Sequence, residues 1–112
     1  MELPDFEQRL ALFCGFGDAS RLAIITELVA GERRPTDLVR ATGLRQPNVS
    51  AHLACLWDCG LVAREQRGRE VYYRLTEGVP EFLEAADRVL GRAGETVGSC
   101  PRYGRGRARA AA

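Results

Sequence analysis

The fold is decided by residues 35–75, which read PTDLVRATGLRQPNVSAHLACLWDCGLVAREQRGREVYYRL. Two short segments carry apolar residues at helical spacing, and Gly43 separates them. After Gly60 the spacing changes from helical to alternating, over residues 62–65 and again over residues 70–75. Between these two runs, Gly68 can adopt the positive φ that a tight turn requires. The stretch therefore predicts helix, turn, helix and β-hairpin.

Helical patterns also lie on both sides of this stretch. Residues Leu3 to Gly17 are predicted to form a helix with one apolar face. A second helix, for which Asp18 can provide the N-cap, repeats this pattern with Leu22, Ile25 and Leu28/Val29 and ends at Gly31. A last helix begins at Val79 and is weakened by later glycines. The predicted order is α-α-α-α-β-β-α. This order is mainly α with a β-hairpin (α+β), and it is typical of a winged helix-turn-helix.

The second helix of the motif, which we call the reading helix, starts with side chains that can contact DNA bases. They are short or carry amides, and they can donate to and accept from base edges in the major groove, while Leu53 and Leu56 hold the helix to the core. Arginines at the hairpin tip can touch phosphates or enter a minor groove. An ordinary polar helix start and a solvated loop are the alternative, but the ordered set of elements favours DNA binding. The predicted DNA-binding residues are Arg45, Gln46, Asn48, Ser50, His52, Arg64, Arg67 and Arg69.

Length and charge limit the classes of protein. The chain has 112 residues, enough for one core, with 46% hydrophobic and 28% charged residues, as in a soluble globular protein. Its 16 basic residues are all Arg and face 15 acids, for a net charge of +1, which argues against a non-specific polycation. No apolar run approaches the roughly 18–20 residues of a membrane span, and the first residues do not form a signal peptide. We expect a cytoplasmic protein that does not bind membranes.

One helix-turn-helix with its hairpin, which we call the reading head, makes few contacts with DNA. We therefore expect a homodimer that binds palindromic double-stranded operator DNA. The first and last helices carry spare apolar faces and are the predicted dimer interface. We expect residues 1–93 to form the winged helix-turn-helix DNA-binding and dimerisation domain. Residues 94–112, rich in Gly, Arg and Ala, are expected to form a flexible C-terminal tail that contains Cys100.

Two cysteines four positions apart on the reading helix predict a metal site. Cys55 and Cys59 share one helix face with β-carbons roughly 5–6 Å apart, which is too far for a disulfide but suits a metal bridge. Either cysteine alone could be a core filler. Cys100 lies in a segment with little else to pack, so we take it as the third ligand.

Three sulfur ligands favour soft ions: cadmium or lead(II), with arsenite or mercury as further possibilities. Affinity for the ion should fall at low pH, because the thiols must lose protons to bind it. For Cys14, four residues after Leu10, packing is favoured over ligation. His52 shares the stripe of Cys55 and Cys59, and as a ligand it would make a mixed nitrogen–sulfur site better suited to zinc.

Four motifs in this order resemble the ArsR/SmtB family of metal-responsive winged-helix repressors. They are DASRLAII at 18–25, LRQPNVSAHLACL at 44–56, GLV at 60–62 and GREVYY at 68–73. The resemblance covers about residues 5–92. It implies a homodimer that represses a metal-resistance or efflux operon and leaves DNA when it binds metal.

Within that family, the cysteine positions resemble the CmtR branch of cadmium/lead sensors. Residues 33–45 contain no cysteine, so the arsenite-type motif is absent, whereas Cys55 and Cys59 lie within the reading helix. The branch completes its site with a cysteine from the C-terminal region of the partner subunit, which Cys100 matches. The histidine and acidic pairs of the zinc sensors are missing, since His52 is the only histidine.

Other classes of function are less well supported. A thiol-based redox sensor or an arsenite-sensing repressor of the same fold is the alternative, in which another stimulus replaces cadmium or lead. A single histidine, the absence of a CxxC motif and the absence of a phosphate-binding glycine loop argue against an enzyme with a small-molecule substrate.

Overall fold

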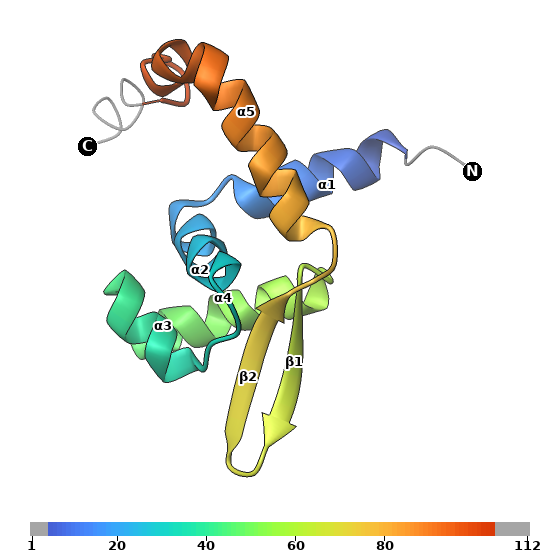
Figure 1. Cartoon of the computed structure of the whole chain (residues 1–112), viewed down its shortest axis with the longest axis vertical. Helices are drawn as coiled ribbons and strands as arrows, with labels where there is room; N and C mark the ends of the chain where they lie inside the picture. Colours follow the sequence, from blue (N-terminus) through green and yellow to red (C-terminus); the bar gives the residue numbers. More distant parts are fainter. Residues whose placement is uncertain (1–4, 105–112) are drawn as a thin grey trace. The chain divides into compact units, whose positions relative to one another are not determined.

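The computed structural model describes residues 5–104 and confirms the predicted order of elements. These residues form two compact units, and the chain passes from the first to the second between Glu77 and Gly78. The elements, labelled in Figure 1, are α1 (Phe6–Phe16), α2 (Ala19–Val29), α3 (Pro35–Thr42), α4 (Gln46–Asp58), β1 (Val62–Arg67), β2 (Glu70–Leu75) and α5 (Val79–Gly98).

Aspartates fix the starts of the first two helices. The Asp5 carboxylate accepts a hydrogen bond from the backbone N–H of Gln8 (2.7 Å), and Asp18 accepts one from the backbone N–H of Arg21 (2.9 Å). These bonds satisfy N–H groups that the first turn of a helix leaves without a partner. The predicted cap of α2 is therefore confirmed. Leu3, predicted as part of the first helix, lies outside the described residues.

The core of the first unit is made by one face each of α2, α3 and α4. Its fully buried side chains are Ile24, Ile25, Leu38, Val49, Leu53 and Leu56. The prediction that Leu22 faces inward is wrong, since 40% of its surface is exposed. Successive residues of an α-helix are rotated by 100° around its axis. The middle of the buried face of α2 lies between the directions of residues 24 and 25, and Leu22 points about 100° away from it.

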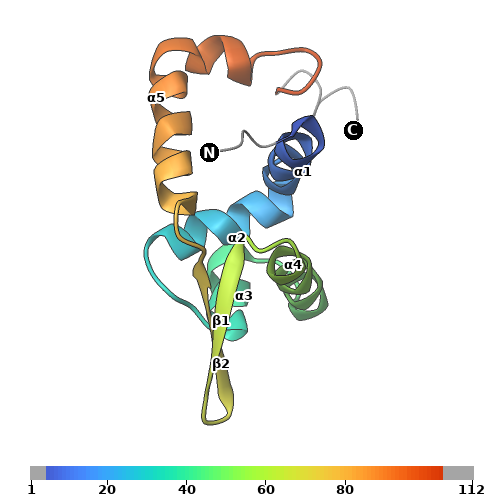
Figure 2. The ribbon, with the colours of Figure 1, turned by 90° about the vertical axis from the view of Figure 1, so that its right-hand side faces the viewer.

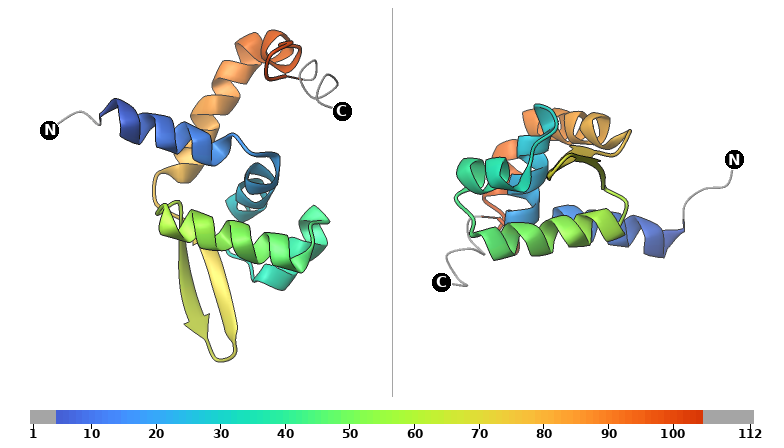
Figure 3. Two further views of the ribbon diagram at one scale, coloured as in Figure 1. Left: turned by 180° about the vertical axis from the view of Figure 1, so that it is seen from behind. Right: turned by 90° about the horizontal axis from the view of Figure 1, so that it is seen from below.

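Helices α3 and α4 form the predicted helix-turn-helix. Pro35 is the first residue of α3, where its missing N–H removes no intrahelical bond. The Asp37 carboxylate accepts from the backbone N–H of Arg34 (2.9 Å) and ties the first turn together. Gly43 ends the helix at φ +74°, and α4 begins three residues later. Figure 3 shows α4 crossing the base of the hairpin on its way back from this turn.

The hairpin is longer than the sequence predicts. Strands β1 and β2 are antiparallel and pair from Val62 with Leu75 to Arg67 with Glu70, so only Gly68 and Arg69 form the turn. Gln66 and Arg67, expected in the turn, belong to β1, because Gly68 at φ +61° allows the chain to reverse in two residues. Figure 2 shows the hairpin projecting beyond α3 and α4, as a wing does.

The second unit consists of α5 and the residues that follow it. Helix α5 continues to Gly98, so the predicted domain boundary at residue 93 falls within it. The division of the chain at that residue stays a prediction, and residues 105–112 of the expected tail lie outside the described part. No helix in residues 5–104 is long and apolar enough to cross a membrane.

Candidate functional site

Helix α4 presents two different polar flanks on either side of its buried stripe. At 100° per residue, the buried Val49, Leu53 and Leu56 occupy one arc of the helix. The first flank, on one side of this arc, consists of Gln46, Ser50 and Trp57. The second flank, on the other side, consists of Asn48, His52, Cys55 and Cys59. Of the residues on these two flanks only His52 is half-buried, and the others are exposed.

The first flank faces the hairpin. The Gln46 amide Nε2 donates to Ser50 Oγ (3.3 Å), so these two reading residues lie together on the first turns of the helix. Farther along, the Arg64 guanidinium lies 4.3 Å from the centre of the Trp57 ring. A cavity of about 470 Å³ lies here, lined by Trp57, Arg64, Gln66, Val71 and Tyr73. Gln46 and Ser50 therefore lie on the same flank of α4 as Trp57, which contacts the hairpin through Arg64.

The second flank faces the start of α2. His52 helps to lower the pKa of the Asp18 carboxyl, although the main cause is the hydrogen bond from the backbone N–H of Arg21. His52 is therefore close to the N-terminus of α2, away from Gln46 and Ser50. Asn48 lies one turn earlier and is exposed. Sequence reasoning grouped these four residues as one reading set, whereas the structure divides them between two flanks.

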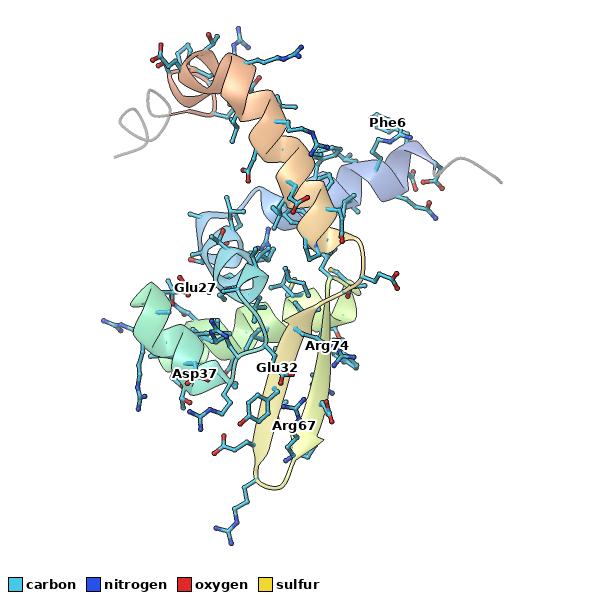
Figure 4. The ribbon with its side chains drawn as sticks, viewed as in Figure 1. Phe6, Glu27, Glu32, Asp37, Arg67 and Arg74 are labelled. Carbon is cyan, nitrogen blue, oxygen red and sulfur yellow. The ribbon has the colours of Figure 1, made fainter. Side chains whose placement is uncertain are left out.

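The three predicted wing arginines have different surroundings. Arg64 stacks on Trp57, as described above. Arg67 donates to both carboxylate oxygens of Glu32 (2.6 and 3.0 Å) and to Glu65 (2.9 Å), and it lies over the ring of Tyr72. Figure 4 labels Arg67 on the hairpin and Glu32, which lies between α2 and α3.

Arg69 is at the turn and is exposed, and no ion pair within residues 5–104 involves it. Arg45, at the N-cap of α4, is exposed as well. The structure thus leaves two of the predicted DNA-binding arginines open to a ligand at opposite ends of the reading head, one on the helix and one on the wing.

Cys55 and Cys59 lie side by side at the C-terminal end of α4. Both are exposed, so they are not core fillers, and neither is in a disulfide. Burial raises the pKa of the Cys59 thiol, and the charge and hydrogen bond of Cys55 raise it further, whereas Arg21 lowers it. Cys59 also lines a cavity of about 310 Å³ with Gln8, Ala11, Leu12 and Leu61. The two sulfurs can act as a pair of soft donors.

The other two cysteines lie on other elements of the chain. Cys100 follows α5 in the second unit, where the backbone N–H groups of Tyr103 and Arg102 lower the pKa of its thiol. Within residues 5–104, no three His, Cys, Asp or Glu side chains are grouped closely enough to hold a metal ion. One chain therefore supplies two of the three predicted ligands at one place.

Cys14 is exposed on α1, so it does not pack within the described part of a single chain, and the preference for packing over ligation stays a prediction. The physical reason is that the apolar face of α1 beside it is itself uncovered. Phe6, Leu10 and Phe13 are 73%, 52% and 54% exposed. This face is larger and more open than scattered surface apolar residues, and such patches are typical of interaction surfaces.

Sequence reasoning missed Glu32 and Trp57. Glu32 lies 35 residues before its partner Arg67, and no local pattern marks such a pair. Trp57 is the only tryptophan of the chain and directly follows the buried Leu56, so its position on the hairpin flank could have been found from helical periodicity.

Comparison with known proteins agrees with this geometry. The model of the family "Bacterial regulatory protein, arsR family" matches residues 18–64. The solution structure of the cadmium metal-sensor CmtR from Mycobacterium tuberculosis has a TM-score of 0.62 and 34% identity, covering 72% of this chain and 85% of that one. The chain belongs to the ArsR family.

Other ArsR-family relatives differ in what their names say they do. A probable mercury resistance operon repressor from Streptomyces lividans is 37% identical over 70 residues, which are 62% of this chain and 54% of that protein. A homodimeric winged helix-turn-helix DNA-binding domain from Mycobacterium bovis has a TM-score of 0.67 and 28% identity, covering 79% of this chain and 82% of that one. The chain spans about half the length of the first curated relatives that it matches.

Proposed function

We propose that this ArsR-family chain is a metal-sensing transcriptional repressor. As an apo homodimer it binds operator DNA, and soft thiophilic ions, cadmium or lead, release it by binding to cysteine thiolates. The ligands are Cys55 and Cys59 of one subunit and Cys100 of the partner subunit. The observation that carries the proposal is the exposed thiol pair on the reading helix itself.

The reading head supports DNA binding. Gln46 and Ser50 lie together on the exposed first turns of α4, and Arg45 adds an uncompensated positive charge there. Side chains of this kind recognise base edges in a major groove, and a projecting hairpin with an exposed arginine reaches the neighbouring backbone. The domain from Mycobacterium bovis with the same fold is a DNA-binding domain.

Uncovered apolar faces support a homodimer. The apolar face of α1 is more than half exposed, and in the second unit Val89 and Leu90 of α5 are 60% and 46% exposed. A second copy would cover both faces by two-fold symmetry and would place two reading heads on one palindromic site. It would also supply a third thiol to each pair, since no third donor lies beside Cys55 and Cys59 in the described chain.

The position of the thiol pair supports release by a soft ion. Thiolates prefer cadmium, lead and mercury to hard ions such as magnesium. Binding to Cys55 and Cys59 would act on the same rigid helix that carries Gln46 and Ser50. A coupling free energy of roughly 1–3 kcal/mol, which is a 5- to 150-fold change in DNA affinity, is typical of such regulation.

The experiment is a cadmium titration of the protein bound to DNA. The probe is a duplex selected from a random pool by the wild-type chain, and the readout is fluorescence anisotropy together with the absorption of sulfur-to-metal charge transfer. We expect Cys55→Ser, Cys59→Ser and Cys100→Ser to stay on the DNA at cadmium levels that release wild type. Cys14→Ser is the matched control and should be released normally. Release of Cys55→Ser and Cys59→Ser at wild-type cadmium levels would contradict the proposed site.

Arsenite or mercury sensing and thiol redox sensing are the alternatives, because the same exposed thiols would serve them. Titration of the complex with arsenite and mercury distinguishes the ions. Release by peroxide in the presence of a chelator, reversed by dithiothreitol, would instead identify a redox switch.

A further inference from the structure

Residues 30–34, which we call the connector, join α2 to α3. Three successive residues of the connector, Glu32, Arg33 and Arg34, interact with the hairpin. Arg33 and Tyr73 exchange two backbone hydrogen bonds (3.0 and 2.8 Å), which makes the connector a one-residue third strand beside β2. On one side of this bridge Glu32 binds Arg67, and on the other Arg34 lies 3.9 Å from Glu70.

Arg67 reaches across the sheet to make its contact. It lies on β1, whereas the connector pairs with the far edge of β2. Its guanidinium lies over the ring of Tyr72 on β2, 4.6 Å from the ring centre, and binds both oxygens of Glu32 beyond it. Bidentate pairing and stacking on an aromatic face both hold a guanidinium in one orientation. The arrangement therefore joins both strands of the hairpin to the connector.

The same contacts turn Arg67 away from a role as a DNA ligand. Glu32 and Glu65 together hold three of its hydrogen bonds and keep the pKa of the guanidinium above its usual value. One arginine and two carboxylates carry a net charge of −1, which would repel a phosphate. Arg69, two residues farther on at the turn, forms no ion pair with any residue of the described range 5–104.

We propose that Glu32 and Arg67 form a clamp that sets the position of the wing relative to the helix-turn-helix, so that Arg67 is a positioning residue rather than a DNA contact. A two-stranded hairpin has little stability of its own and requires support from the body of the protein. Isolated surface ion pairs contribute little, but a bidentate arginine within a network is the exception. The clamp holds the strands, and the exposed Arg69 at their turn contacts the backbone of DNA.

The test compares Glu32→Gln, Arg67→Gln and the double variant, with Glu77→Gln and Arg74→Gln as matched controls for charge. The first readout is amide hydrogen exchange of β1 and β2 without DNA. We expect exchange to become about 3- to 10-fold faster in all three clamp variants, with the amides of α4 unchanged. Hairpin exchange at the wild-type rate in Glu32→Gln and Arg67→Gln would overturn the clamp.

The second readout is affinity for the duplex selected by the wild-type chain, and it rests on the proposed function. A clamp predicts that Glu32→Gln and Arg67→Gln both weaken binding, by about threefold, and that the double variant is no weaker than either. If Arg67 instead contacts DNA, Glu32→Gln frees it and tightens binding while Arg67→Gln loosens it, which would overturn the positioning role. If the wild-type chain selects no DNA, the proposed function fails while hydrogen exchange still decides the clamp.

Discussion

Replacing Arg69 tests which wing residue contacts DNA, and the magnitude follows from the structure. Arg69 is exposed at the two-residue turn of the hairpin, with Gly68 at φ +61° bending the chain beside it. Each arginine that neutralises a phosphate adds about 0.9 to the slope of log affinity against log salt concentration. A dimer has two wings, so Arg69→Gln should lower the slope by about 1.8.

The slope converts into a measurable ratio. Between 50 and 200 mM salt, a difference of about 1.8 corresponds to a change of about tenfold. The affinity advantage of wild type over Arg69→Gln should therefore be about ten times larger at 50 mM than at 200 mM salt. Fluorescence anisotropy with the selected duplex, at four or more salt concentrations, measures both slopes directly.

Arg74→Gln is the control for this experiment, because it removes the same charge from β2, nearer the base of the hairpin (Figure 4). We expect it to leave the slope within about 0.5 of wild type. Equal slopes for Arg69→Gln and wild type would refute the assignment of Arg69 to a phosphate. An equal loss in both variants would show that total charge matters and the position on the wing does not.

Three further changes test the reading helix and its support. Leu53→Ala removes a fully buried side chain of α4 and should lower the free energy of unfolding by about 2–5 kcal/mol, measured by urea denaturation. The Arg34 side chain and backbone N–H lower the pKa of Asp37 from 3.8 to about 2. The stabilising contribution of this half-buried surface pair, about 1 kcal/mol or less, is therefore present above pH 4 and lost as the pH falls to 2. Denaturation of Asp37→Asn should lack that part of the pH dependence. Trp57→Leu removes the ring on which the Arg64 guanidinium stacks. We expect it to weaken DNA binding, measured by fluorescence anisotropy, about 2- to 5-fold, which corresponds to the loss of one exposed cation–π contact. An unchanged affinity would mean that the stack has no role in binding.

Local signals in the sequence were sufficient for the order of elements. Asp18 and Gly43 mark a helix start and a helix end by chemistry that depends only on neighbouring residues, and both positions agree with the structure. The hairpin followed from alternation around Gly68, although β1 extends two residues farther than predicted. Leu22 was misplaced because its spacing fits an apolar face, whereas burial depends on which neighbouring helix that face meets.

Pairings between distant segments could not be predicted. Glu32 and Arg67 are 35 positions apart, and each alone is an ordinary exposed charge. The same limit applies to the proposed metal site. The proximity of Cys55 and Cys59 was predictable from helical spacing, but no local pattern shows which third donor reaches them. A donor from a second subunit would depend on an interface that no pattern within one chain describes.

The geometry of α4 restricts how metal binding and DNA binding can be coupled under the proposed function. Cys55 and Cys59 lie 9 and 13 residues after Gln46, which is roughly 14–20 Å along the helix axis at 1.5 Å per residue. They also lie on the flank that faces α2, away from Gln46 and Ser50. An ion at the thiols is therefore too far from Gln46 and Ser50 to displace DNA from these two residues by direct contact. Coupling must act through the position of α4 as a rigid body, and the residues that anchor it, Leu53 and Leu56, lie between the two sites.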